Sequence, residues 1–188
     1  MIRLLYLTAT IVLSPAVSAC AFLQHLLPGL TLSDSNIVSV LDGLDENEID
    51  AAQLAQEKAT APEVKAFAGR VMNEHRELTQ TNGRLAAQLG LQPESSALAV
   101  QLKQAHEQAM RKLRMTWGPA FDRAYVEYEI QQHVQAFNFV ETAAESEGNP
   151  QLKQELIRTG PDLLSHISAA RALERHLDSE SRDAVAAR

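Results

Sequence analysis

Apolar side chains recur along most of this chain at alternating steps of three and four residues, which is the spacing of one face of an α-helix. Proline and glycine residues divide the pattern into separate segments, because both residues interrupt helices. The pattern predicts helices over residues 34–59, 62–89, 95–115, 119–147 and 150–177.

Four of these segments are long and carry one narrow apolar stripe, whereas the segment 95–115 is shorter and more polar. Helices of this kind bury their stripes against one another, so a bundle is the stable solution. Short turns pair the long helices into two hairpins. Residues 90–118 connect the hairpins, and this connection is long enough to run the full length of the bundle. The predicted fold class is all-α, a ferritin-like four-helix bundle with a long helical crossover between the second and third main helices. A simple up-and-down bundle is the alternative.

The first residues have the layout of a secretory signal peptide, with a basic Arg3, a short apolar run and small residues before Cys20. The segment Val17-Ser18-Ala19-Cys20 resembles the bacterial lipobox, in which the cysteine is lipidated and becomes the mature N-terminus. Cys20 is also the only cysteine of the chain. We therefore predict a lipoprotein-type signal peptide with lipidation at Cys20. Plain secretion with a free thiol is the alternative.

These features divide the chain into a signal peptide (1–19), an anchor or linker (20–32), a helical bundle (33–178) and a flexible tail (179–188). Residue 21 is alanine and not aspartate, which in lipoproteins of this kind indicates the outer membrane. The predicted location is the periplasmic face of that membrane, with the lipid anchor as the membrane contact. If lipidation does not occur, the protein is periplasmic or secreted.

Composition and charge exclude several classes of function. The chain has 188 residues, 24 acidic and 17 basic, and a net charge of −7, which argues against nucleic acid as a partner. A single cysteine excludes a disulfide framework and a cysteine-based zinc site within one chain. The sequence contains no glycine-rich phosphate loop and no serine nucleophile elbow. No reaction and no protein partner or oligomeric state follows from it.

Polar residues fall on the apolar stripe of each long helix, namely Glu48, His75, His133 and His166. Glu48 lies 13 residues before Ala61 and His75 lies 14 after it; His133 lies 16 before Asn149 and His166 lies 17 after it. At 1.5 Å per residue, each pair lies at nearly the same height, ~20–25 Å from a helix end. One polar residue from each helix is therefore expected in one layer near the middle of the bundle.

One glutamate and three histidines make a shell for one divalent metal ion, because imidazole and carboxylate ligands suit Zn, Cu, Ni or Fe. Glu129 precedes His133 by one helical turn and is a possible fifth ligand or a partner of a ligand. Glu74 points about 100° away from His75 and is expected in water or as a partner of a ligand. The alternative is a buried hydrogen-bond network without metal. His25, His106 and His176 are expected at the surface.

Several segments spread over the chain from about Asp34 to Leu177 match one pattern of spacing. They are Glu48-Ile49-Asp50-Ala51-Ala52-Gln53-Leu54-Ala55, Pro62-Glu63-Val64-Lys65-Ala66-Phe67-Ala68, Met72-Asn73-Glu74-His75, Phe121-Asp122-Arg123-Ala124-Tyr125-Val126 leading to His133, and Leu163-Leu164-Ser165-His166. With these segments the chain resembles the bacterial domain of unknown function 4142 family, described as predicted outer-membrane proteins with a ferritin-like fold. The resemblance implies a ferritin-like bundle in the periplasm and no settled activity.

The di-iron enzymes of the same fold use two Glu-x-x-His pairs with further carboxylates. Here Glu74 directly precedes His75, and Leu163 stands three residues before His166, so two bridging carboxylates are missing. This argues against ferroxidase or oxygen-activating chemistry. Three hypotheses remain: a metal-binding or metal-responsive periplasmic bundle, a non-catalytic structural, interaction or stress-related lipoprotein, and, with least support, an enzyme with a single-metal site.

Overall fold

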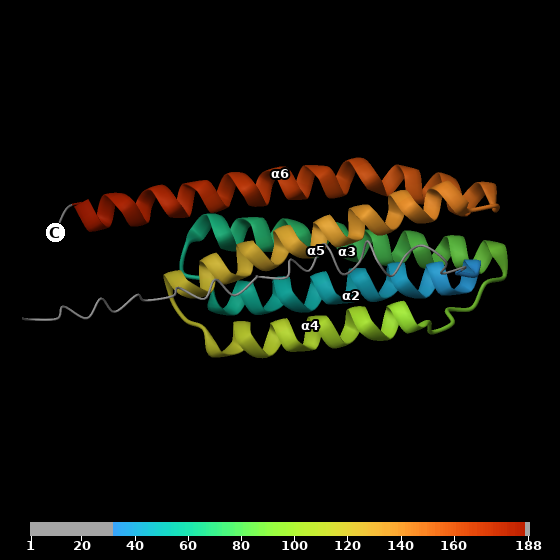
Figure 1. Cartoon of the computed structure of the whole chain (residues 1–188), viewed down its shortest axis with the longest axis horizontal. Coiled ribbons are helices and arrows are strands. Elements are labelled where there is room, and N and C mark those ends of the chain that lie inside the picture. Colours follow the sequence, from blue (N-terminus) through green and yellow to red (C-terminus); the bar gives the residue numbers. More distant parts are fainter. Residues whose placement is uncertain (1–31, 187–188) are drawn as a thin grey trace, which may run out of the picture. The chain divides into compact units, whose positions relative to one another are not determined.

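The computed structural model describes residues 32–186, and within that range it contains five α-helices and no β-strand (Figure 1). The predicted signal peptide and the lipidation site at Cys20 lie outside the described residues. The helices are α2 (Asp34–Lys58), α3 (Pro62–Leu89), α4 (Ala97–Met115), α5 (Pro119–Ser146) and α6 (Pro150–Ala186).

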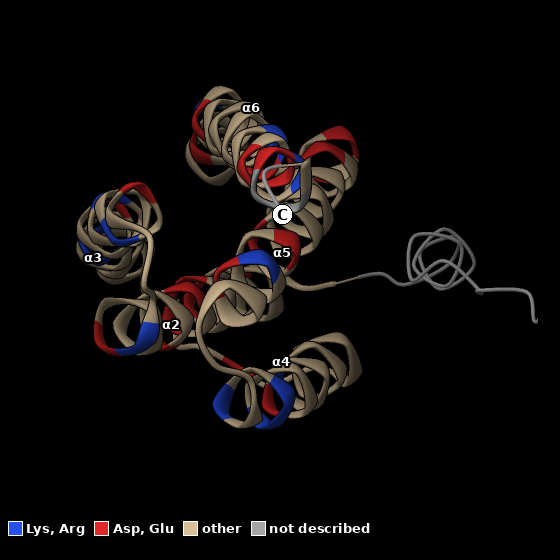
Figure 2. Ribbon diagram, turned by 90° about the vertical axis from the view of Figure 1, so that its left-hand side faces the viewer, with Lys and Arg blue, Asp and Glu red and all other residues tan. Residues whose placement is uncertain are grey.

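Four of the helices form a bundle of two antiparallel hairpins, α2 with α3 and α5 with α6. The hairpins pack so that α2 lies beside α5 and α3 lies beside α6. Helix α4 runs back along the bundle, so that α3 and α5 begin at the same end (Figure 1). Figure 2 shows α4 outside the four-helix core, where it packs on α2 and α5. The predicted all-α, ferritin-like bundle with a helical crossover is thus confirmed.

The helix ends have clear local causes. Ser33 and Asn36 form a capping box at the start of α2, each side chain accepting a hydrogen bond from the other residue's backbone N–H. Asp122 in the first turn of α5 accepts hydrogen bonds from the backbone N–H groups of Thr60 (2.9 Å) and Ala61 (3.0 Å). Its carboxylate thus satisfies free donors at the start of α3 and ties the first hairpin to the second.

The core is continuous along the bundle, and its largest fully buried side chains come from all four main helices. Tyr125 and Phe121 stack with ring centroids 6.3 Å apart beneath the turn between α2 and α3. Helix α4 contributes a short apolar stripe, Leu98, Met110 and Leu113. Burial of side chains of this size contributes about 1.5–3 kcal/mol each, so the bundle gives a firm scaffold for the polar groups within it.

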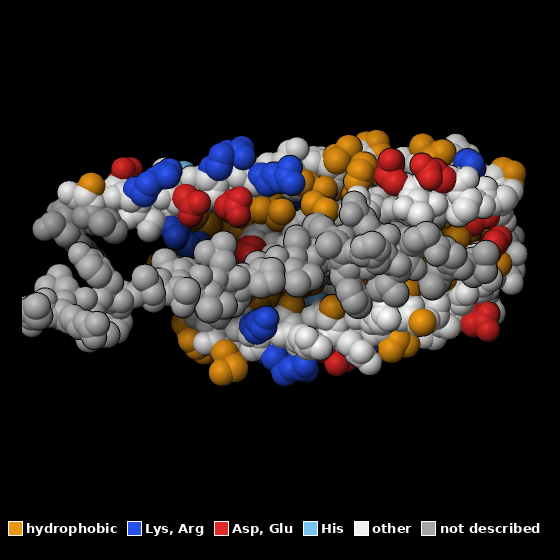
Figure 3. Space-filling model, viewed as in Figure 1, with side chains coloured by type: hydrophobic (Ala, Val, Ile, Leu, Met, Phe, Trp, Pro, Cys, Tyr) orange, Lys and Arg blue, Asp and Glu red, His pale blue; other side chains and the backbone are white. Residues whose placement is uncertain are grey.

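Helix α6 continues beyond its expected end near Leu177, through most of the predicted tail, to Ala186. No proline or glycine follows Pro161 in the chain, and the added turns contain good helix formers such as Glu180 and Arg182. Within residues 32–186, no helix combines the length and the apolar character needed to cross a membrane. Figure 3 shows acidic and basic side chains interspersed along α6 on the face drawn.

Candidate metal centre

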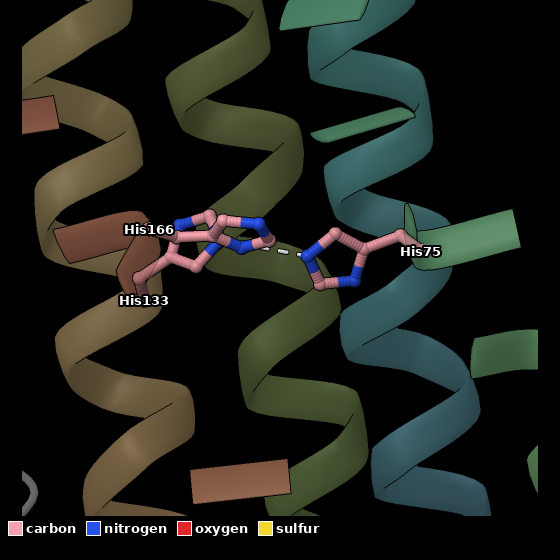
Figure 4. Close-up of side chains that lie close together, drawn as sticks. All are labelled: His75, His133 and His166. Atoms are coloured by element: carbon pink, nitrogen blue, oxygen red, sulfur yellow. Dashed lines mark hydrogen bonds between the residues drawn. The ribbon is translucent and has the colours of Figure 1, made fainter. Parts of the chain in front are cut away.

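Three imidazoles meet in the middle of the bundle, His75 from α3, His133 from α5 and His166 from α6. The exposed fractions of these residues, backbone included, are 3%, 1% and 2%. His133 Nε2 lies 3.4 Å from His75 Nε2 and 2.9 Å from His166 Nδ1. Figure 4 shows the three rings pointing toward one another. The structure therefore brings together three of the four residues that the sequence places in one layer.

The outer nitrogen of each ring is held by an oxygen acceptor. His75 Nδ1–H donates to Asp45 Oδ1 at 2.8 Å, and His133 Nδ1–H donates to the backbone carbonyl of Glu129 at 2.9 Å. His166 Nε2–H donates to the carboxylate of Glu74. These three hydrogen bonds fix the orientation and the tautomer of each neutral ring, as outer partners do in metal sites.

Because each neutral imidazole carries one N–H, the three inner nitrogens present lone pairs to one another. A proton there would create a buried imidazolium ion. Burial, followed by the proximity of His75 and His166, lowers the pKa of His133 well below its usual range. Burial also lowers the pKa of His166, although the hydrogen bond to Glu74 opposes this shift. The three inner nitrogens are therefore converging hydrogen-bond acceptors, and burial makes protonation of any of them unfavourable.

The spacing of the inner nitrogens suits one metal ion. With metal–nitrogen bonds of 2.0–2.1 Å, ligand nitrogens lie about 2.9–3.4 Å apart for bond angles between 90° and 109°. The two distances from His133 Nε2, 2.9 and 3.4 Å, fall in this range, and all three nitrogens lie within 4.8 Å of one another. The rings are not stacked: the His133 and His166 planes are perpendicular. Three imidazoles facing one point can coordinate one face of a metal ion.

Glu48 and Glu129 lie on the other side of the His133 ring. Glu129 Oε2 is 3.5 Å and Glu48 Oε1 is 4.0 Å from His133 Nδ1, the ring nitrogen that faces away from the other two histidines. Both carboxyl groups are buried, and Glu129 has no exposed surface. Glu48, expected in the same shell as the imidazoles, thus belongs with Glu129 to a separate group around His133.

Asp45 is not among the residues that the sequence predicts for the centre, and Glu74 was expected either in water or as the partner of a ligand. Asp45 is buried, and it also accepts a hydrogen bond from Asn82 Nδ2 at 3.0 Å. Burial raises the pKa of Asp45, although the hydrogen bonds from His75 and Asn82 oppose the shift. One sequence signal was present, because Asp45 lies three residues before Glu48 and so on the same side of α2.

The expected surface position of His106 was wrong, because this side chain is buried between α4 and the bundle. Its Nδ1 lies 2.8 Å from the hydroxyl of Tyr128, and its Nε2 lies 3.0 Å from Asp50 Oδ2. The polar sequence of α4 hid this contact, since docking of α4 and not helical spacing buries the ring. His176 is exposed, as expected, and His25 lies outside the described residues.

Comparisons with known proteins give a family and a fold. The family model described as "Domain of unknown function (DUF4142)" matches residues 26–173. No curated protein matches the chain. The chain is similar to a crystal structure described as that of the "putative secreted protein DUF305 from Streptomyces coelicolor", with 11% identity and a TM-score of 0.66 over 76% of this chain and 92% of that chain. At this identity the similarity shows the helical fold alone.

Proposed function

We propose that this chain, which belongs to the family described as Domain of unknown function (DUF4142), binds one divalent transition-metal ion between His75, His133 and His166. The observation that supports this proposal is the direction of the hydrogen bonds. All three N–H groups point outward to oxygen acceptors, and all three lone pairs point inward. A cation at that point removes the repulsion among the lone pairs without protonating a buried ring.

The ligand type favours zinc, copper, nickel or iron, because neutral imidazole suits these ions better than it suits magnesium or calcium. The surrounding helices hold the ligands rigidly, and Asp45 and Glu74 place negative charge behind two of the rings. We infer a role in binding or responding to metal in the cell envelope, and we assign no reaction.

The alternative function is a structural or interaction protein whose histidines form a hydrogen-bond network. The 2.9 Å distance between His133 Nε2 and His166 Nδ1 favours it, because this is the length of an ordinary hydrogen bond. Such a network requires one additional proton among the inner nitrogens. It predicts a loss of stability when one of the rings is removed but no response to metal ions.

Elemental analysis of the purified protein, made without an affinity tag, distinguishes the two functions. We expect about one zinc, copper, nickel or iron ion per chain, and a higher melting temperature when that ion is added back to chelator-treated protein. His166→Ala should abolish both effects. His176→Ala is the matched control, because His176 lies on the same helix and is exposed. Trace metal only, with no thermal shift for any of the four ions, would exclude the metal function.

We further propose that the bundle is tethered to the outer membrane by a lipid on Cys20 and faces the periplasm. The support is the Val17-Ser18-Ala19-Cys20 segment after an apolar run. Replacing Cys20 by alanine should move the protein from the membrane fraction to the soluble periplasmic or secreted fraction. Equal fractionation of the variant and the native chain would contradict the anchor.

A further inference from the structure

Two buried acidic side chains face each other next to the three-histidine cluster, Glu48 from α2 and Glu129 from α5. One carboxylate oxygen of each lies within 4.8 Å of the other and of His133 Nδ1. Glu48 Oε2, both carboxylate oxygens of Glu129 and the hydroxyl of Tyr125 are buried and have no hydrogen-bond partner. Oxygens of three side chains are thus gathered in a dry part of the core, where the Tyr125 hydroxyl beside Glu129 is the one group of the three with a permanent donor.

Buried carboxylates need a compensating positive charge or strong donors. The described residues supply no positive charge here: neither carboxylate pairs with a lysine or arginine in residues 32–186, and the nearby His133 Nδ1–H is directed to the Glu129 backbone carbonyl. Burial, followed by repulsion from Glu129, raises the pKa of Glu48 well above its usual range, and burial raises the pKa of Glu129 to about 7. Both pKa values are raised because no positive charge lies close enough to stabilise the ionised carboxylates.

We infer that Glu48 and Glu129, with the Tyr125 hydroxyl, form a second cation site next to the three-histidine site. This inference extends the proposed metal-binding function, but it depends on different atoms. The unpartnered oxygens face the Nδ1 side of the His133 ring, whereas the three-histidine site lies on the Nε2 side. The ring of His133 therefore stands between the two positions.

The ligand chemistry of the second site selects a different class of ion. An all-oxygen set suits harder cations than imidazole does. Calcium requires six to eight oxygens, and magnesium keeps several of its waters, so a fully buried set of two carboxylates and one phenol suits neither well. Manganese(II), or iron(II) with its intermediate preference, fits best, since two bidentate carboxylates and the Tyr125 oxygen offer up to five ligand atoms.

Titration of zinc-loaded full-length protein with Mn²⁺ tests the inference, with free Mn²⁺ followed by electron paramagnetic resonance. We expect the native chain to bind one Mn²⁺ in addition to one Zn²⁺. Glu129→Gln and, as an independent variant, Glu48→Gln should lose the Mn²⁺ and keep the Zn²⁺. Glutamine preserves the volume of the side chain and removes a buried charge, so both variants are expected to fold. Glu127→Gln is the matched control, because Glu127 is exposed on the same helix.

The outcomes separate this inference from the proposed function. Zn²⁺ bound without any Mn²⁺ would overturn the second site and leave the three-histidine site standing. Mn²⁺ binding that survives Glu129→Gln but is lost in His166→Ala would also overturn it, because the ion would then occupy the histidine cluster. Mn²⁺ bound by the native chain and by His166→Ala, with none of Zn²⁺, Cu²⁺, Ni²⁺ and Fe²⁺ bound at the histidines of the native chain, would support the second site and contradict the proposed function. Binding of none of these ions would overturn both.

Discussion

Replacing Glu74 by glutamine tests whether a partly exposed residue next to the three-histidine centre contributes to its metal affinity. Glu74 accepts a hydrogen bond from His166 Nε2, and its side chain is 45% exposed, whereas that of His166 is 3% exposed. The substitution keeps the length of the side chain and removes its charge. Without the anionic acceptor, His166 Nδ1 becomes a weaker ligand, since a carboxylate on one ring nitrogen raises the basicity of the other.

The size of the effect follows from the role of Glu74 as the partner of a ligand. Loss of such partners costs about 10- to 100-fold in metal affinity, which corresponds to about 1.4–2.7 kcal/mol at 25 °C. The stability of the metal-free protein should change by less than about 1 kcal/mol, because water competes for a hydrogen bond whose carboxylate is nearly half exposed. Affinity and stability should therefore respond to different extents.

Competition with a chromophoric chelator measures the Kd for Zn²⁺ of the tag-free native chain, Glu74→Gln and Glu77→Gln. Glu77 lines the same surface hollow of about 330 Å³ next to His166 and is exposed, so its substitution makes the same change of charge. We expect the control to stay within about threefold of the native affinity. An unchanged Kd for Glu74→Gln, or equal losses in both variants, would refute the argument that the Glu74–His166 contact tunes the site.

Three further predictions concern metal-free protein and urea unfolding. Burial raises the pKa of Glu129 from 4.5 to about 7 in the folded state, so ionisation of this carboxyl destabilises the folded protein increasingly as the pH rises from 4.5 through 7. Glu129→Gln should therefore have a higher free energy of unfolding than the native chain at pH 8, by about 1–3 kcal/mol, and a nearly equal one at pH 4. The same gain in stability at pH 4 would contradict this reasoning. His106→Ala leaves the hydroxyl of Tyr128 without its partner and should cost about 1–3 kcal/mol, against no measurable change in His176→Ala. Asp122→Ala removes the acceptor for the Thr60 and Ala61 N–H groups and should cost about 1–2 kcal/mol; a neutral result would mean that water replaces the carboxylate.

The elements of the fold could be predicted from the sequence because local signals mark their ends. Pro62, Pro119 and Pro150 each begin a helix, and Gly90, with φ of 67°, ends one. Helix α6 continues past its predicted end because no helix-breaking residue follows Leu177, although the charged and small residues there are typical of a tail. The intrinsic helix propensity of these residues keeps the segment helical, although the apolar stripe does not continue through it.

The centre was only partly predictable. The height of a residue in the bundle follows from its distance to a turn, which is why His75, His133 and His166 could be placed together. The direction of a side chain depends on how each helix is rotated against its neighbours, and the sequence does not fix that rotation. Glu48 therefore has the expected depth but faces the Nδ1 side of His133. Asp45 pairs with His75 across α2 and α3; its spacing from Glu48 places it on the correct side of α2, but only the packing of the two helices selects His75 as its partner.

The three histidines come from both hairpins, since His75 belongs to the first and His133 and His166 to the second. They are separated along the chain by 58 and 33 residues. An ion held by all three would act as a removable cross-link that closes these long loops and clamps one half of the molecule to the other. Resistance of the folded protein to proteases would then rise and fall with the supply of that ion.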